Sequence, residues 1–463
     1  LGKCVALQNC NPGAEKKTDC IENLVIWIQT MSVKRKIAVI GAGWSGLSAA
    51  VNLAGKADVT MFEAGKTAGG RARALAADNA GFSFLDNGQH IMMYAYRGVR
   101  HLMDKIGADY RHDCVRLPLQ WHLADGLQFQ TASLPAPLHL LWGVLGAKNV
   151  RWSDKAALLK QMRNLRIWHG EDVPVGKWLR SQQCPQKLLA GFWRPLVLGA
   201  LNTPIEDASL RVLRAVLEDG VWADKHAADY LLPKTDLNTL LVEPAIRFLR
   251  RHGVRLYFEQ RVGRLALLPG GRVAVNGEPF DAVVAAVAPY HISALMPSET
   301  PEDIQTAFEG IRYHAITTVY LRYAETVRLP SVMTGLAEGT VQWFFRRGCL
   351  GASDREVAAV ISVSEHVGRL SAEEWIRRAD ADLHRICPEI GTPIAAKVIT
   401  EKRATAASYA NRPLPDCRWL QQNGIYPAGD YLHPRYPATL EAAVQSGLAA
   451  AELILCEYGG SGY

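Results

Sequence analysis

The segment from residue 36 to residue 63 alternates between short apolar runs and a helical pattern. Lys36 to Ile40 is an apolar run, glycines follow it, Leu47 to Ala54 has a helical pattern, and Asp58 to Phe62 is a second apolar run. Short apolar runs bounded by turn residues are typical of buried strands. The pattern therefore predicts a strand, a helix and a second strand, which together form a βαβ unit.

The middle of the chain changes from a hairpin to helices. Two alternating segments between Leu119 and Thr131 flank Ala124-Asp125-Gly126, which predicts a β-hairpin. Ser153 is expected to cap a helix from Asp154 to Trp168. Further helical patterns run to about Asp229.

Strand patterns return after a helix that is expected from Thr235 to His252 and is stopped by Gly253. Ser371 and Glu374 have the spacing of a capping box, which opens another helix. The expected strands are 254–259, 261–268, 272–276 and 282–287 in the first domain, and 315–323, 341–346 and 356–363 in a second sheet.

A strand around Tyr426 and a helix from Thr439 to Cys456 return the chain to the first domain. A chain of 463 residues, 49% of them hydrophobic, is long enough for two interleaved domains. We therefore predict an α/β fold. The first domain, a Rossmann-like nucleotide-binding domain, comprises residues 34–100, 230–292 and 395–463, and the second, an α+β substrate-binding domain, comprises 101–229 and 293–394.

Residues 1–33 are expected to form a poorly ordered N-terminal extension outside the fold. Residues 1–30 precede Met31 and lack a basic head, an apolar core and a small-residue cleavage site. One interpretation is that they are a translated upstream stretch, with Met31 as the natural start.

Charge and cysteine content narrow the classes of function. The formal net charge is +7, but the basic residues are scattered, which argues against a nucleic-acid partner and favours a mild attraction to anionic lipid. The nine cysteines form no CxxC pair, so we expect neither a metal site nor disulfides, and a reducing cytosol fits. Leu134 to Gly146 is the longest apolar stretch, and it is too short and proline-interrupted to span a bilayer.

Gly41-Ala-Gly43-Trp44-Ser45-Gly46 lies directly after a predicted strand and opens a helix. Its glycines permit a tight turn, a close approach of the backbone to a pyrophosphate and close helix packing. Glu63 ends the next strand and is positioned to accept hydrogen bonds from ribose hydroxyls. This context predicts dinucleotide binding, without separating FAD from NAD.

The residues after Glu63 favour FAD. Ala64 is followed by the pair Gly69-Gly70 and by Arg71, so that a flexible backbone can wrap an extended cofactor while the guanidinium meets its diphosphate. The alternative is a plain surface turn with a solvated arginine. Near the C-terminus, Gly429-Asp430 ends a strand, where the aspartate can hold a ribityl hydroxyl and the following helix N-terminus can stabilise negative charge on the flavin.

The run Leu85-Asp86-Asn87-Gly88-Gln89-His90 places polar residues between apolar flanks, which costs free energy on burial unless the groups find partners. We interpret it as a contact to flavin or substrate; the alternative is a polar loop whose side chains are satisfied by one another.

Together these segments resemble the flavin amine oxidase and phytoene desaturase superfamily. More narrowly, the 85–90 run resembles the hydroxysqualene dehydroxylase family when it is taken with Phe192-Trp-Arg-Pro195, Leu201-Asn-Thr-Pro204, Gln342-Trp-Phe344, Glu401-Lys-Arg-Ala-Thr405 and Pro437-Ala-Thr-Leu-Glu441. The likeness runs from about Lys34 to Cys456. Tyr431 and Ala442 depart from the pattern, which usually has Trp and Gly there, so these two positions bear on the contour beside the flavin.

The resemblance implies a flavoprotein with two dinucleotide-binding motifs that holds FAD. Its activity would be the reductive removal of a hydroxyl group from hydroxysqualene, which gives squalene and belongs to hopanoid biosynthesis. The leaving hydroxyl needs an acid, and Asp86 and His90 are the candidates. The candidate FAD contacts are Gly41, Gly43, Trp44, Ser45, Gly46, Glu63, Ala64, Gly69, Gly70, Arg71, Asn87, Gly88, Gln89, Val262, Gly429, Asp430, Ala438 and Thr439.

A C30 isoprenoid substrate must be taken from a bilayer, so we expect an apolar tunnel and peripheral association with the inner face of the cytoplasmic membrane. Residues 134–145 are the candidate apolar lip, unless they pack into the core; Trp193 and Trp343 are candidates for the tunnel wall. The rival hypotheses are a carotenoid desaturase, an amine oxidase with an aromatic cage of Tyr431 and Trp343, and a lipid-binding flavoprotein without catalysis. The electron donor stays open among free reduced flavin, NADPH and a protein.

Overall fold

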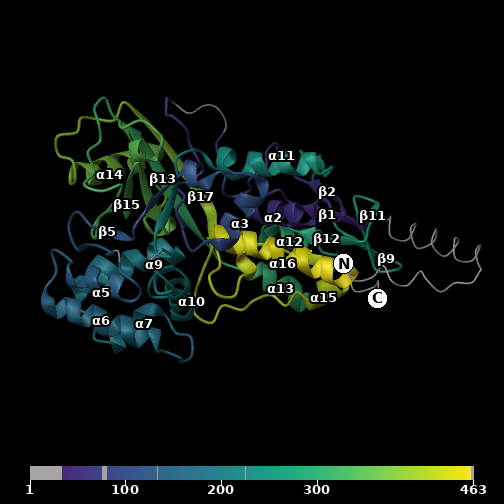
Figure 1. Ribbon diagram of the computed structural model, residues 1–463, viewed down its shortest axis with the longest axis horizontal. Coiled ribbons are helices and arrows are strands. Elements are labelled where there is room, and N and C mark those ends of the chain that lie inside the picture. The colour runs from purple at the N-terminus through teal and green to yellow at the C-terminus, as the bar shows by residue number, and fades with distance from the viewer. Residues whose placement is uncertain (1–33, 76–80, 133, 225, 460–463) are drawn as a thin grey trace, which may run out of the picture.

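The computed structural model describes residues 34–75, 81–132, 134–224 and 226–459. The N-terminal extension expected at residues 1–33 lies outside the described residues. Figure 1 shows a domain built around β1, β2 and β12, a second region with β13, β15 and α14, and a group of helices from α5 to α10 beside it.

A five-stranded parallel sheet forms the centre of the first domain. Its strand order is β18-β12-β1-β2-β8, and all four neighbouring pairs are parallel. The predicted strands β1 and β2 have the expected bounds. The strands are β1 (Lys36–Ile40), β2 (Asp58–Phe62), β8 (Arg255–Tyr257), β12 (Ala282–Ala285) and β18 (Ile425–Pro427).

Two helices from opposite ends of the chain pack together against this sheet. They are α2 (Trp44–Leu53) and α16 (Leu440–Gly459), which lie side by side in Figure 1. The Ser48 hydroxyl on α2 donates to the Val444 carbonyl of α16 at 2.8 Å. A side chain at Gly447 would place its Cβ 2.0 Å from the Ser45 carbonyl oxygen, so only glycine permits this close approach.

The second sheet is antiparallel, with the order β14-β15-β16-β13-β17. Its strands are β13 (Tyr313–Arg322), β14 (Met333–Gly335), β15 (Trp343–Arg346), β16 (Glu356–Ser362) and β17 (Ala395–Ala406). The predicted boundary at residue 395 assigned β17 to the first domain. The strand instead pairs with β13 from Tyr313–Ala406 to Arg322–Ala395, and so belongs to the second sheet.

A layer of helices completes the second region. It contains α5 (Leu138–Leu145), α6 (Trp152–Arg166), α7 (Val175–Ser181), α9 (Arg194–Leu201) and α10 (Leu210–Val216). The predicted cap at Ser153 is wrong: α6 begins at Trp152, two residues earlier than expected, with Arg151 at the N-cap and no side-chain cap. The turn starts there because the Arg151 carbonyl already accepts the Asp154 amide at 3.1 Å.

Smaller elements connect these layers. The predicted hairpin is confirmed as β5 (Gln120–His122) paired with β6 (Gln128–Gln130). The predicted cap of α14 is also confirmed, because the Ser371 side chain accepts the Glu374 amide. The remaining main elements are β3 (Met92–Met93), α3 (Arg97–Ile106), β4 (Cys114–Leu117), β7 (Tyr230–Pro233), α11 (Glu243–Arg251), β9 (Ala266–Leu268), β10 (Arg272–Val275), β11 (Glu278–Phe280), α12 (Pro289–Leu295), α13 (Glu302–Glu309), α14 (Ala372–His384) and α15 (Arg418–Gln422).

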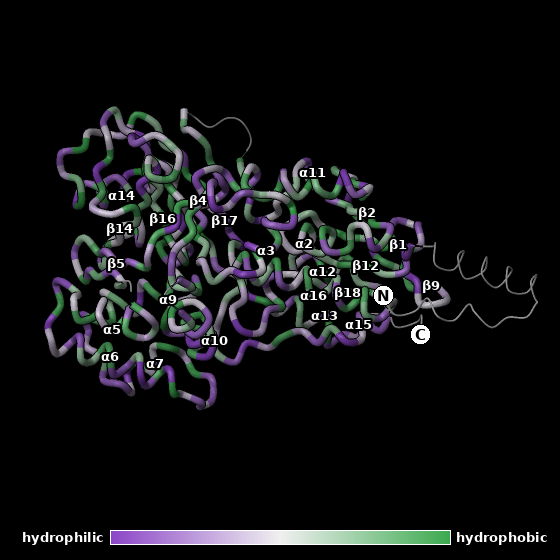
Figure 2. Tube along the Cα trace, in the orientation of Figure 1, coloured by the Kyte–Doolittle hydropathy of each residue, from purple (hydrophilic) through white to green (hydrophobic). Residues whose placement is uncertain are grey.

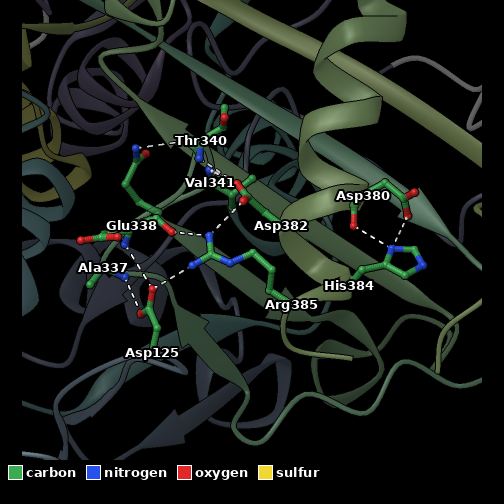
Figure 3. Close-up of polar contacts among 10 residues, drawn as sticks. Asp125, Ala337, Glu338, Thr340, Val341, Asp380, Asp382, His384 and Arg385 are labelled. Atoms are coloured by element: carbon green, nitrogen blue, oxygen red, sulfur yellow. Dashed lines mark hydrogen bonds and ion pairs between the residues drawn. The ribbon is translucent and has the colours of Figure 1, made fainter. Parts of the chain in front are cut away.

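A polar network fixes the loop that precedes β15 (Figure 3). The Asp382 carboxylate accepts the amides of Thr340 at 2.7 Å and Val341 at 3.0 Å. Arg385, at the end of α14, pairs with Asp382 and with Asp125 in the turn of the hairpin, each at 3.2 Å. This network fixes the position from which Trp343 projects.

Candidate functional site

A cavity of about 750 Å³ lies where the carboxyl ends of the parallel strands meet the antiparallel sheet. Ile40 and Phe62, the last residues of β1 and β2, line it, and Phe345 and Val360 of the second sheet line it from the other side. Ligands of open α/β sheets bind at the carboxyl ends of the strands. We call this space the main cavity.

The glycine loop has the geometry that its sequence predicted. Gly41 has φ +99°, and a Cβ there would lie 2.4 Å from the Ala286 carbonyl oxygen. A Cβ at Gly46 would lie 1.9 Å from the Gly41 carbonyl oxygen, so the third glycine permits helix α2 to start tightly against the turn. Gly43, the N-cap of α2, provides no side-chain cap, so the helix start is left to a ligand's oxygens.

Ser45 carries a polar atom that has no partner in the described structure. The residue lines the main cavity and is 6% exposed, yet its buried hydroxyl makes no hydrogen bond. An unsatisfied buried hydroxyl costs about 1–3 kcal/mol. A phosphate oxygen at the start of α2 would supply the missing partner.

Glu63 lies at the next point along the main cavity. Its Oε2 accepts the Ala42 amide and its Oε1 accepts the Gly65 amide, both at 2.7 Å. The carboxylate is therefore held in place by backbone amides from two different loops. Each oxygen retains a lone pair, which suits it to the two hydroxyls of a ribose.

Arg71 and Asp430 join the two ends of the chain beside the main cavity. The Arg71 guanidinium donates to the Asp430 carboxylate and, through Nη1, to the Ala404 carbonyl at 3.2 Å. Gly69 and Gly70 precede this arginine with φ +117° and +62°, values that favour glycine. The glycine pair thus turns Arg71 toward the C-terminal segment, where it pairs with Asp430. The contact of Arg71 with a diphosphate stays a prediction.

The 85–90 run lies between the two sheets. Asn87 donates to the Arg71 carbonyl at 2.7 Å and accepts the Arg73 amide at 3.2 Å, and His90 contacts the same Asn87 oxygen at 3.3 Å. Burial raises the pKa of Asp86 to about 7. Burial also lowers the pKa of His90 to about 4, so the ring is neutral at pH 7.

The structure brings the predicted residues together with few exceptions. Gly46 does not line the main cavity; it packs against Gly41 of the glycine loop, which does. Asp86 lines a smaller neighbouring cavity, which His90 shares with the main one. That the predicted site residues contact a cofactor stays a prediction. The predicted residues that line the main cavity are Gly41, Gly43, Trp44, Ser45, Glu63, Ala64, Gly69, Gly70, Arg71, Asn87, Gly88, Gln89, His90, Val262, Gly429, Asp430, Ala438 and Thr439.

The main cavity also has an apolar part that the sequence motifs did not reveal. We call it the apolar chamber; it is lined by Leu198, Leu201, Ile316, Trp343, Phe345 and Val360. Trp343, but not Trp193, therefore lines this wall. Trp193 is fully buried and donates to the Gln161 side chain at 2.7 Å, which makes it a core residue.

Several polar residues of the cavity wall were missed as candidates, and two of them are Glu401 and Tyr290. Glu401 of β17 and Tyr290 of α12 line the main cavity. Glu401 appeared only within a family motif, because a carboxylate in an alternating strand is more often solvated. Its position opposite Ile316 in the β13–β17 pairing places it at the cavity.

One cavity thus contains an uncapped helix start suited to a phosphate, a carboxylate suited to a ribose and a C-terminal Gly-Asp turn. These features define a protein that binds an extended dinucleotide beside an apolar substrate chamber. The chain belongs to the family described as flavin containing amine oxidoreductase, whose model matches residues 44–455. FAD is therefore the cofactor, and the protein is an FAD-dependent oxidoreductase.

The chain is similar over most of its length to hydroxysqualene dehydroxylases and to phytoene desaturases. The chain is 28% identical to the hydroxysqualene dehydroxylase of Zymomonas mobilis subsp. mobilis over 90% of its length and 98% of that relative. It is 28% identical to the hydroxysqualene dehydroxylase of Rhodopseudomonas palustris, covering 91% and 99%. The 15-cis-phytoene desaturase of Narcissus pseudonarcissus is 24% identical, covering 91% of this chain and 80% of that relative.

Solved structures agree with the fold. Cyclohexylamine oxidase from Brevibacterium oxydans has a TM-score of 0.69 at 16% identity and covers 92% of this chain and 100% of that one. Reduced UDP-galactopyranose mutase has a TM-score of 0.67 at 14% identity, covering 92% and 94%. The predicted α/β fold of a flavoprotein is therefore confirmed.

Proposed function

We propose that the protein removes the hydroxyl group of hydroxysqualene in a reductive reaction that gives squalene and water, a step of hopanoid biosynthesis. The observation that carries this proposal is the continuity of the cofactor loops with the apolar chamber in one cavity. An apolar wall suits a hydrocarbon chain. Full-length similarity to hydroxysqualene dehydroxylases supports this substrate over other apolar ones.

The reaction requires a hydride at carbon and a proton at the leaving oxygen. Bound FAD, once reduced, supplies the hydride. The chain itself must hold the hydrocarbon in place, exclude bulk water and deliver the proton. Leu198, Ile316 and Val360 provide the apolar contact, and the 85–90 run lies at the polar side of the same cavity.

An amine oxidase is less well supported. The proposed aromatic cage requires Tyr431 and Trp343 to face each other across a substrate amine. The Tyr431 ring packs instead against Phe308, with ring centroids 6.1 Å apart, and the Trp343 ring packs against Trp121 at 5.0 Å. Both rings line the main cavity, but each packs against its own aromatic partner in a different hydrophobic cluster.

The test is anaerobic incubation of the FAD-loaded protein with hydroxysqualene and chemically reduced flavin, followed by mass spectrometry of the lipid extract. We expect squalene to accumulate with enzyme concentration and time. Phytoene and a primary amine, tested with oxidised enzyme, are the rival substrates. Turnover of either without any squalene from hydroxysqualene would contradict the proposal.

We further propose that the protein docks on the inner face of the cytoplasmic membrane through helices α5 and α6. Of the ten large hydrophobic side chains exposed in the described residues, six lie in this segment. Figure 2 shows the hydrophobic character of α5 at the periphery of the molecule. We call these six residues the α5–α6 surface; they are Leu138, Leu141, Trp142, Leu145, Trp152 and Ile167.

The charge of the segment supports an anionic bilayer as its partner. Five basic side chains between residues 148 and 166 are exposed, and the segment's one carboxylate, Asp154, is buried. Basic residues beside inserted apolar side chains strengthen binding to anionic lipid. Within the described residues, no helix combines the length and the apolar character needed to cross a membrane. The basic side chains are Lys148, Arg151, Lys160, Arg163 and Arg166.

A further inference from the structure

A second cavity, of about 10 Å³, lies behind the wall of the main cavity. Gln89 and His90 line both spaces, and among the described residues only these two do so. Asp86 and Tyr320 line the small cavity but not the main one. A space of roughly 10–15 Å³ accommodates one water molecule when polar groups surround it. Here a carboxyl group, an imidazole and an amide do so.

The Asp86 carboxyl group is fixed from one side and open on the other. Its Oδ1 accepts the Leu237 amide at 3.0 Å, and its backbone carbonyl accepts the Tyr320 hydroxyl at 3.2 Å. Within the described residues its Oδ2 has no hydrogen-bond partner, although the residue is only 8% exposed. The second oxygen is therefore available to the small cavity.

His90 is held in one tautomer by Asn87. The Asn87 amide group donates to the Arg71 carbonyl, so its oxygen is an acceptor, and that oxygen contacts His90 Nε2 at 3.3 Å. Nε2 is accordingly assigned the proton. Nδ1 has no partner among the described residues, so the ring can accept a proton at Nδ1 while releasing one from Nε2.

We propose that Asp86 is the proton reserve of the dehydroxylation and acts through His90 across the small cavity. This inference rests on the proposed function. As the carbon–oxygen bond of the substrate breaks, the Nε2 proton moves from its 3.3 Å contact with Asn87 to the oxygen, which leaves as water. Nδ1 takes the Asp86 proton through one water molecule, and reduced FAD would supply the hydride to carbon. The resting state returns when Asp86 takes a proton from solvent and the imidazole exchanges its Nδ1 proton for one at Nε2.

The electrostatics agree with these roles. Burial and the neighbouring Asp236 carboxylate raise the pKa of Asp86, whereas the Leu237 amide and the Arg347 guanidinium oppose the rise, and the balance is about 7. With a pKa of about 7, Asp86 is about half protonated at pH 7 and mostly protonated at pH 6. Glu356 pairs with Arg347 at 2.9 Å, so part of the positive charge that Arg347 presents to Asp86 is neutralised. Burial keeps His90 neutral, with a pKa near 4, so it passes a proton on instead of storing it.

The test measures single-turnover squalene formation by the reduced holoenzyme as a function of pH. The wild-type rate should fall above about pH 7 as Asp86 ionises. Asp86→Asn should lower the rate at pH 6 by roughly 100-fold or more and abolish the inflection, and Asp86→Glu should restore part of both. Asp236→Asn, which keeps an N-terminal cap for residues 238–242, should move the inflection to lower pH.

Glu401→Gln is the matched control for the rival acid in the main cavity. It should leave the inflection in place. An inflection that survives in Asp86→Asn, or that disappears in Glu401→Gln, would overturn the relay.

A measurement that needs no substrate tests the Asp86–His90 relay independently of the proposed dehydroxylation. Infrared difference titration of the holoenzyme, wild type minus Asp86→Asn, should show a carboxyl group that titrates near pH 7, with a band that His90→Gln shifts. A band indifferent to His90 would also refute the relay. Absence of squalene from the wild type at every pH is a different failure, namely that of the proposed function.

Discussion

The guanidinium of Arg71 donates to the carboxylate of Asp430, a residue 359 positions further along the chain. This pair lies beside the main cavity and links the glycine pair after Glu63 to the Gly-Asp turn before α16. A single cofactor site is therefore assembled from the two ends of the sequence. Asp430 is 8% exposed, and the Arg71 guanidinium is the cation that pairs with its buried carboxylate.

Replacing Arg71 by Met should weaken both folding and FAD binding. The substitution leaves the Asp430 carboxylate buried and unpaired, which costs about 3 kcal/mol in the free energy of unfolding. We expect the dissociation constant of FAD to rise at least tenfold, measured by quenching of flavin fluorescence. The double variant Arg71→Met/Asp430→Asn should recover stability in urea unfolding but not affinity. Unchanged FAD affinity in Arg71→Met would show that the arginine has no part in the site.

Ser45 and Ser48 form a matched pair on one helix. The Ser45 hydroxyl has no partner in the described structure, whereas the Ser48 hydroxyl donates to the Val444 carbonyl at 2.8 Å. Ser45→Ala should leave apoprotein stability unchanged or slightly higher and weaken FAD binding by about 1 kcal/mol, or roughly fivefold. Ser48→Ala should lower apoprotein stability by about 1 kcal/mol with little effect on affinity. Calorimetric titration with FAD and urea unfolding measure the two effects; reversed results would place the phosphate elsewhere.

The parts of the site that were predictable are those encoded by neighbouring residues. The Gly41 turn, Glu63 and the Gly69-Gly70 pair each follow a strand within a few residues, and a parallel sheet brings strand ends to one edge. Local pattern was therefore enough to place them at one cavity.

The apolar chamber was not predictable in the same way. Leu198, Ile316 and Val360 come from three separate elements, and each has the apolar pattern of an ordinary core position. Trp193 and Trp343 show why sequence pattern was not enough: both were candidates, but Trp193 is a core residue and Trp343 lines the chamber. Tertiary packing decides which neighbours a side chain faces. It also decides that β17 pairs with β13.

The α5–α6 surface should bind anionic vesicles. We expect the wild type to co-sediment with phosphatidylglycerol-containing vesicles more strongly than with phosphatidylcholine alone, and less strongly as salt increases. The triple variant Leu138→Ser/Leu141→Ser/Trp142→Ser should lower the partition constant at least tenfold, because each exposed side chain loses about 1 kcal/mol of burial. Ile394→Ser, at an exposed apolar position outside this surface, is the control. Equal loss in the control would contradict docking through these helices.

His90 should make stability depend on pH in a defined window. Its pKa is lowered from 6.5 to about 4 in the folded protein. Below pH 6.5 the unfolded chain binds a proton that the folded protein does not, so stability falls between pH 6.5 and 4. The wild type should therefore lose of the order of 3 kcal/mol relative to His90→Gln over this window in urea unfolding. A difference between the two proteins that is constant with pH would show that His90 is not buried as a neutral ring.

We propose that the FAD of this protein delivers reducing equivalents to a hydroxylated hydrocarbon held in the main cavity. The most direct measurement is anaerobic stopped-flow mixing of the photoreduced holoenzyme with hydroxysqualene, in which flavin absorbance and squalene are quantified together. We expect the flavin to reoxidise and one squalene to form for each flavin reoxidised. A flavin that stays reduced while hydroxysqualene is recovered intact would contradict it.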